Sequence, residues 1–218
     1  MQLRKKYKNG LLLGIASLVS LTCFQQCTLG TAPFYSLNDL TTVIPLKVGA
    51  TWTYRQINYQ DVGPPFEDTI TVVKKIARSI DTLSSRYYAV EETSYYKNST
   101  FIGIYSETIT TDQYTQWRGP KGEIPYFPEI VLELPLTTGN QWFFNGKDTT
   151  YGYVRIMNAD TTIQTPSRVF EHTLFVKVIH VRVFPIEEFF IAPGIGIVKE
   201  LISSGFGGYS RELTSANF

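Results

Sequence analysis

From residue 51 onward, apolar and polar side chains alternate along short segments separated by turn-forming residues. A period of two is typical of β-strands with one buried face, and no window sustains the helical period near 3.6 residues. The pattern predicts strands over Thr51–Gln60, Asp68–Ile80, Arg86–Lys97, Phe101–Thr111, Gln113–Arg118, Gln141–Gly146, Thr149–Met157, Thr161–Thr165, Thr173–Val183, Glu188–Ala192, Gly196–Ser203 and Tyr209–Thr214. For Pro128–Leu136, a short helical turn is an alternative. We therefore expect an all-β fold, a curved antiparallel sheet that is half-barrel or barrel-like.

A short pattern occurs twice along the chain. Ile44–Tyr54 and Leu134–Phe144 share Pro, Leu, Gly, Trp and a final aromatic residue at the same offsets. We expect the Gly to allow a positive-φ turn and the Trp to open a strand with its ring against the sheet. Unless the match is due to chance, it indicates two pseudo-repeated β halves, at about residues 43–120 and 133–205.

The N-terminus has the pattern of a secretory signal peptide. Residues 1–10 are cationic, and Leu11–Leu21 form an apolar run. Eleven residues are too few to span a bilayer of about 30 Å as a helix, but they fit the apolar region of a leader. A buried N-terminal helix is the alternative. We predict a signal peptide over residues 1–22.

The chain has two cysteines, Cys23 and Cys27, and both follow this run directly. A disulfide between them would join positions only four apart, outside the β domain. A Cys at the end of the apolar run resembles the lipobox of bacterial lipoproteins, which implies cleavage before Cys23 and its acylation. The preceding Ser20-Leu21-Thr22 departs from the usual pattern, and ordinary cleavage with a soluble product is the alternative. We predict lipidation at Cys23, a tether over residues 23–42 and the β domain over 43–218.

Composition fits an exported globular domain. Hydrophobic residues make up 43% and aromatic residues 14% of the chain, which favours strands. The net charge of +1 includes four basic residues of the leader, and the rest holds 16 basic against 19 acidic residues, about −3. We expect no nucleic acid among its partners, because the chain after the leader has no excess of basic side chains that could bind a phosphate backbone.

The motifs of catalysis and metal binding are weak in this sequence. The two histidines, His172 and His180, would lie about 27 Å apart on one regular strand, too far apart for one metal ion. The adjacent carboxylates Glu91-Glu92 and Glu187-Glu188 would point to opposite faces of their strands. No Gly-x-Ser-x-Gly motif is present. We predict no enzyme activity, no cofactor and no metal site.

Aromatic residues suggest a binding role. They crowd two regions, and we expect core and cross-strand packing for most of them. Alternatively, they line the concave face of the sheet and hold an apolar ligand or a segment of another protein. The residues concerned are Tyr87, Tyr88, Tyr95, Tyr96, Tyr105, Tyr114, Trp117, Phe184, Phe189 and Phe190. The specific ligand-binding residues are not identified by the sequence.

Three segments together resemble uncharacterised bacterial cell-envelope lipoproteins, the TapB-like domain family of unknown function. They are Pro45–Tyr54 (PLKVGATWTY), Phe190–Glu200 (FIAPGIGIVKE) and Thr161–Val178, although Ser167-Arg168-Val169 departs from the family pattern. The resemblance covers roughly residues 43–202. It implies a curved antiparallel sheet like the half-barrels of lipoprotein carriers such as LolA, and it supplies no chemistry.

From the anchor, the sheet and the resemblance we expect a non-catalytic lipoprotein of the bacterial cell envelope, facing the periplasm or on the outer-membrane surface. The acyl anchor would bind the membrane, and the curved sheet would bind a lipid, a peptide or an envelope protein. Two alternatives remain: a structural subunit of an envelope complex, and a hydrolase of envelope polymers.

Overall fold

A computed structural model describes residues 39–60, 67–81, 86–110, 113–117, 130–143, 152–180, 186–203 and 206–218. Within these ranges the chain forms one short helix and a 12-stranded antiparallel sheet, which confirms the predicted all-β fold. The elements are α2 (Leu40–Val43), β1 (Thr51–Tyr59), β2 (Glu67–Asp81), β3 (Arg86–Tyr95), β4 (Thr100–Ile109), β5 (Gln113–Trp117), β6 (Ile130–Glu133), β7 (Gln141–Phe143), β8 (Gly152–Gln164), β9 (Val169–His180), β10 (Ile186–Ala192), β11 (Gly196–Ser203) and β12 (Gly208–Asn217).

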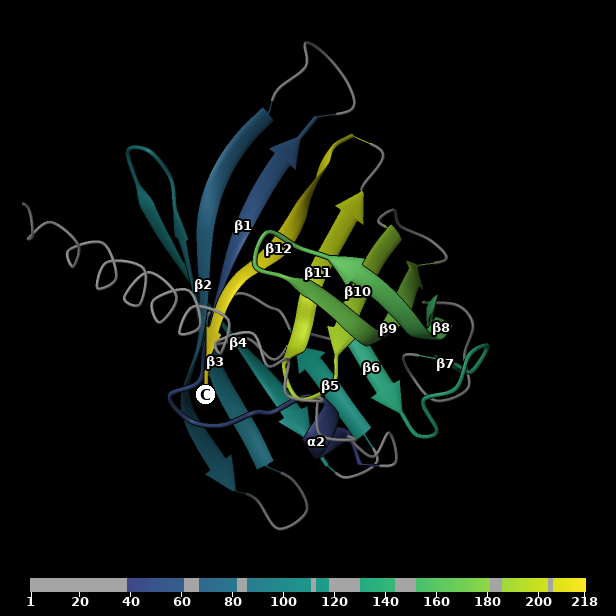
Figure 1. Ribbon diagram of the computed structural model, residues 1–218. Coiled ribbons are helices and arrows are strands. Elements are labelled where there is room, and N and C mark those ends of the chain that lie inside the picture. Colours follow the sequence, from purple (N-terminus) through teal and green to yellow (C-terminus); the bar gives the residue numbers. More distant parts are fainter. Residues whose placement is uncertain are drawn as a thin grey trace, which may run out of the picture. The chain divides into compact units, whose positions relative to one another are not determined.

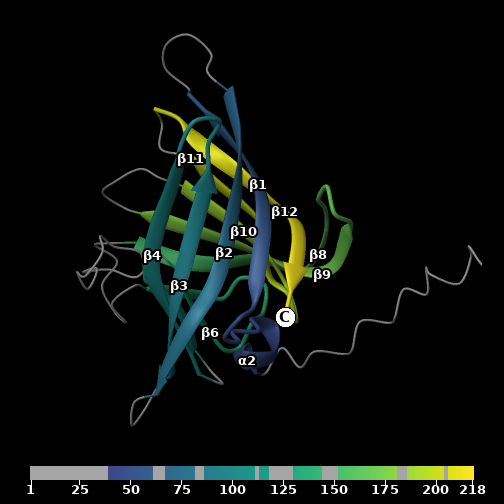
Figure 2. The ribbon, with the colours of Figure 1, turned by 90° about the vertical axis from the view of Figure 1, so that its left-hand side faces the viewer.

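The sheet is a meander whose first and last strands pair. Its order is β6-β5-β4-β3-β2-β1-β12-β11-β10-β9-β8-β7, so all other neighbours are consecutive in sequence. The two edge strands, β6 and β7, come into contact without forming a ladder. The described sheet is therefore nearly closed and barrel-shaped, with its seam between β6 and β7 (Figures 1 and 2).

Alternation along each strand decides which side chains face the interior. In β1, Trp52, Tyr54 and Gln56 are buried, while their neighbours are at least partly exposed. The same period gives the interior its apolar core, because each strand contributes every second residue. Fully buried members include Val72, Ile76, Val90, Tyr114, Leu132, Val154, Ile156, Leu174, Val176, Val178, Phe189, Ile191 and Val198.

Helix α2 lies at one end of the sheet, which we call the α2 end (Figure 2). Its Leu40 and Val43 are fully buried, and the Val43 carbonyl accepts a hydrogen bond from Gly194 N at 3.1 Å. The packed part of the chain thus includes residues that the sequence assigned to the tether. Cys23 and Cys27 lie outside the described residues, and no described helix is long and apolar enough to cross a membrane.

The repeated sequence pattern forms the same turn twice, as predicted. Gly49 has a φ of 90° and donates its N–H to Ile76 O at 2.9 Å. Gly139 has a φ of 92° and donates its N–H to Ile156 O at 2.8 Å. Each turn leads into a strand that begins near a Trp packed in or against the core. The two copies introduce two six-stranded meanders, β1–β6 and β7–β12.

Two details of the sequence prediction are wrong. The helical turn considered for Pro128–Leu136 is not formed, because Ile130–Glu133 is strand β6 and pairs with β5. Thr149–Met157 and Thr161–Thr165 are not separate strands, because Gly152–Gln164 is one strand. Three register shifts against β9 interrupt its alternation, and such irregularities imitate a strand end in the sequence.

Candidate functional site

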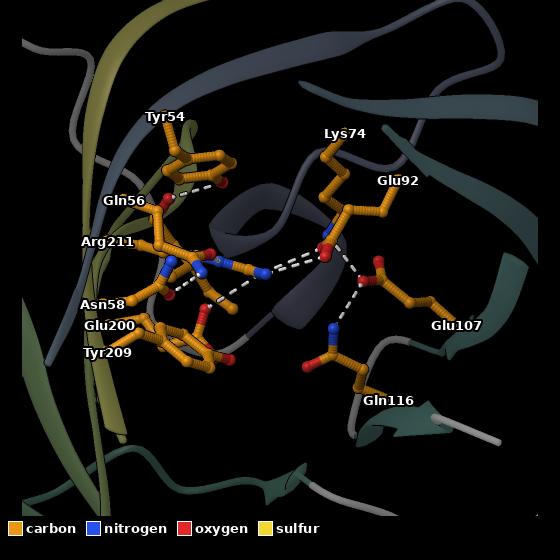
Figure 3. A network of polar contacts seen from close by, with 11 residues as sticks. Tyr54, Gln56, Asn58, Lys74, Glu92, Glu107, Gln116, Glu200, Tyr209 and Arg211 are labelled. Atoms are coloured by element: carbon orange, nitrogen blue, oxygen red, sulfur yellow. Dashed lines mark hydrogen bonds and ion pairs between the residues drawn. The ribbon is translucent and has the colours of Figure 1, made fainter. Parts of the chain in front are cut away.

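Polar side chains cluster inside the sheet, at positions where the alternation along each strand places them on the inner face. They follow buried apolar residues on the same face, as Gln56 follows Tyr54 and Glu200 follows Val198. Figure 3 shows side chains from β1, β2, β3, β4, β5, β11 and β12 converging there. We call this set the interior network: Tyr54, Gln56, Asn58, Lys74, Glu92, Glu107, Gln116, Glu200, Tyr209 and Arg211.

Arg211 of β12 is the centre of one half of the network. Its Nη1 and Nη2 donate to the two carboxylate oxygens of Glu92 at 2.9 and 2.7 Å, and Nη1 lies 3.6 Å from Glu200 Oε2. Its Nε also donates to Gln56 Oε1. The bidentate geometry with Glu92 is the strong form of this ion pair. It connects β12 with β3, which are separated in the sheet by two strands, β1 and β2.

Lys74 of β2 is the centre of the other half. Its ammonium lies 2.5 Å from Glu107 Oε1, and Gln116 Nε2 donates to the same oxygen at 3.3 Å. The Glu107 side chain is fully buried and that of Lys74 is 9% exposed. Burial strengthens this pair but also makes each charge expensive if its partner is lost.

Buried carboxylates outnumber Lys and Arg side chains in the described interior. Lys74 pairs with Glu107, and Arg211 contacts Glu92 and Glu200, while a further buried carboxylate, Glu187, pairs with His180 at 3.2 Å. Among the described residues, the buried oxygens without a hydrogen-bond partner include Glu107 Oε2, Gln116 Oε1 and Glu187 Oε2. Such atoms are rare in folded proteins, and a donor or a cation would satisfy them.

The pKa of Tyr54 reflects the same negative interior. Burial raises it well above its usual value of 10, and the charges of Glu200, Glu107 and Glu92 raise it further, against the opposing effect of Arg211. The hydroxyl of Tyr54 therefore stays protonated and donates to Ile197 O at 3.0 Å. It can act as a fixed donor but not as a base at neutral pH.

Aromatic donors also join the two sequence motifs at the α2 end. Trp52 Nε1 donates to Ile195 O at 2.7 Å, next to the Tyr54 bond to Ile197. The segment PLKVGATWTY thereby lies against APGIGIVK, although β12 separates their strands. These motifs close one end of the sheet and are structural in this protein.

Toward the opposite end, which we call the far end, inward positions become more accessible. Asn58, Ile202 and Tyr209 are only half-buried, and the side chain of His180 is 23% exposed. The polar network therefore lies between the buried apolar side chains at the α2 end and the more accessible residues at the far end.

A second candidate is an open groove of about 480 Å³ at the α2 end. It lies between the β8–β9 hairpin, the β10–β11 turn and the end of β12, and is lined by Phe170, Ile195 and Phe218. Its one charged lining residue, Arg168, stacks over Phe170 at 4.6 Å from the ring centroid. Because its polar chemistry is sparse, the interior network is the stronger candidate.

The two histidines have different partners. His172 and His180 both lie on β9, and they pair with different carboxylates, Asp160 and Glu187. A positive φ of 54° at His172 interrupts the regular strand between them. No group of three His, Cys, Asp or Glu in the described ranges could hold a metal ion.

Adjacent glutamates point to opposite faces, as predicted. Glu92 is inside with Arg211 while Glu91 is exposed, and Glu187 is buried while Glu188 pairs with Lys177 at 2.9 Å. Sequence reasoning did not identify which carboxylates of different strands meet, because it could not place the strands around the interior. The signal was present as Gln56, Lys74, Glu107 and Arg211 on otherwise apolar strand faces.

The aromatic residues divide between core and surface. Tyr88, Tyr114 and Phe189 are buried, which confirms core packing for them, whereas Tyr87, Tyr95 and Tyr96 are exposed. Phe190 stacks on Phe175 with ring centroids 4.8 Å apart, a cross-strand pair. The side chains of Tyr105, Trp117 and Phe184 lie outside the described residues. The aromatic side chains of this set that the structure describes thus do not form one continuous concave lining.

No protein-family model and no curated protein matches this chain. Two solved structures are similar to it. One, from Bacteroides fragilis, is named as a candidate exported protein with a YmcC-like fold; it is 12% identical, with a TM-score of 0.46, over 81% of this chain and 99% of its own. The other is a candidate lipoprotein from Parabacteroides distasonis, 10% identical, with a TM-score of 0.45, over 81% of this chain and 98% of its own. Both similarities are distant in sequence and in structure.

Proposed function

We propose that this protein is a non-catalytic lipoprotein of the bacterial cell envelope that binds a small amphiphilic molecule inside its curved sheet. The leader and Cys23 support the export and the anchor. The interior network supports the binding role. The observation that carries the proposal is a buried polar cluster that includes acceptor oxygens without a hydrogen-bond partner. This cluster lies between the buried apolar side chains at the α2 end and the half-buried residues at the far end.

The charges of the interior define the ligand class. Four glutamates outnumber Lys74 and Arg211, and both cations are already bound by carboxylates. A carboxylate or phosphate brought into this site would meet like charge without a free cation to pair with. A neutral or cationic head group that donates hydrogen bonds is therefore favoured, with its apolar chain against the buried aliphatic residues.

The same ion pairs support a non-catalytic role. Glu92 and Glu200 are bound to Arg211, and Glu107 is bound to Lys74. These contacts engage the carboxylates in ion pairs between strands, which is a structural role. Incubation with isolated cell-wall polymer should release no soluble fragments, and steady release that E107Q abolishes would favour the hydrolase alternative.

A set of probes with one chain length and three head groups tests the binding. We expect n-octylamine to bind the purified protein at neutral pH, n-octanol to bind more weakly, and octanoate to bind at least about 10-fold more weakly than the amine. Isothermal titration calorimetry below the micellar concentrations gives the three dissociation constants. Failure of all three to bind, or preference for octanoate, would refute the proposed site.

A pair of matched variants locates the bound head group. Glu92→Gln removes an inward charge that is 17% exposed, and it should weaken octylamine binding while leaving octanol nearly unchanged. Glu212→Gln removes an equally exposed carboxylate, 17%, that pairs with Arg55 and Lys199 instead of the network, and should change neither constant. Equal effects of both variants would place the binding elsewhere.

A further inference from the structure

Strand β4 extends beyond its neighbour on one side. It pairs with β3 along its whole length, from Thr100 to Ile109, but with β5 only over Ser106–Ile109. No other described strand pairs with Thr100–Tyr105 on that side. The described structure therefore leaves one edge of this segment without a ladder partner.

The backbone groups on this edge can be assigned by their alternation. Ser99 O accepts from Tyr96 N at 2.9 Å, so Ser99 points toward β3, and Thr110 N donates to Gln113 O at 2.8 Å, so Thr110 points toward β5. Backbone groups alternate in direction along an antiparallel strand. The N–H and C=O groups of Thr100, Ile102 and Ile104 therefore point out of the sheet edge.

The side chains of this edge are apolar and accessible. Phe101 is 65% exposed, Ile102 61% and Ile104 39%. No charged side chain and no Pro occurs between Thr100 and Ser106. Natural edge strands normally carry Lys, Pro or a bulge that prevents further pairing. This edge lacks those protections, as expected of a strand that pairs with another chain.

We propose that Thr100–Ile104 pairs antiparallel with the same segment of a second copy, joining two sheets across a two-fold axis. The strand limits the possible registers, because residues with outward backbone groups must face one another and Ser106 is already occupied by β5. Of the registers that remain, one pairs all three outward residues: Ile102 faces Ile102 of the second copy and Thr100 faces Ile104.

This register is also favourable for the side chains. Ile102 meets its own copy at the axis, and no charges are brought together. On the inner face, Phe101 would lie across from Gly103 of the second copy, where an aromatic ring covers the backbone left bare by a glycine. Self-pairing thus satisfies both the backbone and the apolar side chains of the edge.

Disulfide trapping in intact cells tests the register with the full chain. Directly paired residues with facing backbone groups have Cα atoms about 5.5 Å apart, within reach of a disulfide. Ile102→Cys should give a covalent dimer on a non-reducing gel, above the background of the wild type with its own cysteines. Thr100→Cys and Ile104→Cys should give none singly, and the double variant should give one.

A surface control and a disruptive variant complete the test. Val169→Cys, 49% exposed on β9, should remain at background. Ile102→Lys should convert the purified protein from dimer to monomer in sedimentation analysis, while Ile80→Lys, at a position that is also exposed (50%), should not. If Ile102→Cys links no better than Val169→Cys, or wild type sediments as a monomer, a different strand covers this edge and the proposal is wrong.

Discussion

Arg211 connects more of the interior charges than any other residue drawn in Figure 3. Its guanidinium contacts Glu92, Glu200 and Gln56, and its side chain is 8% exposed. Replacing it with Met leaves two carboxylates without their cation inside the sheet. We expect Arg211→Met to lower the free energy of unfolding by about 3–5 kcal/mol, measured by urea denaturation.

Two further variants identify the origin of that loss. Adding Glu92→Gln to Arg211→Met should recover part of it, because one uncompensated charge is removed. Arg55→Met breaks the pair with Glu212, in which the Arg55 side chain is 47% exposed, and should cost less than about 1 kcal/mol. Losses of the same size for Arg55 and Arg211 would mean that the interior pairs are not the stabilising ones.

Tyr54 gives the protein a dependence on alkaline pH. Its pKa in the folded state lies above the usual value of 10, so the unfolded chain loses this proton first as pH rises. The stabilisation is complete below that value and declines as pH rises from there toward the pKa of the folded state. Tyr54→Phe should reduce the decline between about pH 9 and 11, followed by urea denaturation at each pH.

Tyr59→Phe is the matched control for this effect. It removes a similar hydrogen bond, from the Tyr59 hydroxyl to Ile202 O at 3.0 Å, and leaves Tyr54 in place. At neutral pH each variant should lose about 1 kcal/mol, because each leaves a carbonyl without its donor. A decline at high pH that is unchanged in Tyr54→Phe would contradict the assignment.

Among the elements, the two glycine turns offer a direct comparison. Gly49 and Gly139 have φ values of 90° and 92°, and a Cβ atom at either position would meet nothing within 4 Å. The cost of Ala there is therefore one of backbone conformation alone, about 1–2 kcal/mol. We expect similar losses of unfolding free energy for Gly49→Ala and Gly139→Ala, measured by thermal unfolding.

Gly103→Ala is the control within a strand. Its Cβ atom would lie 3.7 Å from Phe101 and 3.9 Å from Glu92 O, at ordinary contact distances and without a positive φ. We expect little change in unfolding free energy for this variant when both it and its reference carry Ile102→Lys, which removes the proposed contact with a second copy. A loss at Gly49 but not at Gly139 would show that the two turns are not equivalent.

The local elements were largely predictable from the sequence because alternation and turn residues act over a few positions. The strand of Thr51–Gln60 and the turns at Gly49 and Gly139 needed no knowledge of the rest of the chain. The sequence did not predict strand β6, because it has only four residues and lies between Pro128 and Pro135. The irregular register of β8 was missed because the shifts depend on its pairing with β9.

The candidate site was less predictable, because it depends on how far the sheet curls. Alternation indicates that Gln56 and Arg211 share faces with apolar residues, but it does not indicate that Glu92 lies opposite Arg211. That contact joins residues 119 positions apart in the sequence. Lys74 and Glu107, on β2 and β4, are likewise separated by an intervening strand.

At the scale of the whole molecule, the pairing of β1 with β12 joins the beginning and the end of the described domain. This pairing runs from Thr51 to Tyr59 and leaves the seam between β6 and β7, where the second meander begins. A polar network that contacts β1, β3 and β12 helps to hold this closure. The ion pairs of the interior therefore stabilise the closed shape of the sheet and also form part of the proposed site.

The anchor is a prediction at the same scale, and it stands on the leader alone. Cells supplied with a clickable fatty acid should label the wild-type chain and not Cys23→Ala, because this substitution removes the residue at which we propose acylation. Cys27→Ala is the matched control and should keep its label. Unchanged labelling of Cys23→Ala would refute lipidation at this position.

The central claim, that the interior of the sheet holds a small molecule, is tested most directly by native mass spectrometry of protein purified from its own membrane. We expect a non-covalent adduct of defined mass, neutral or cationic in its head group, which is retained by Glu212→Gln and lost or weakened in Glu92→Gln. A folded protein that carries no adduct, or one bound equally by both variants, would contradict the proposed interior site.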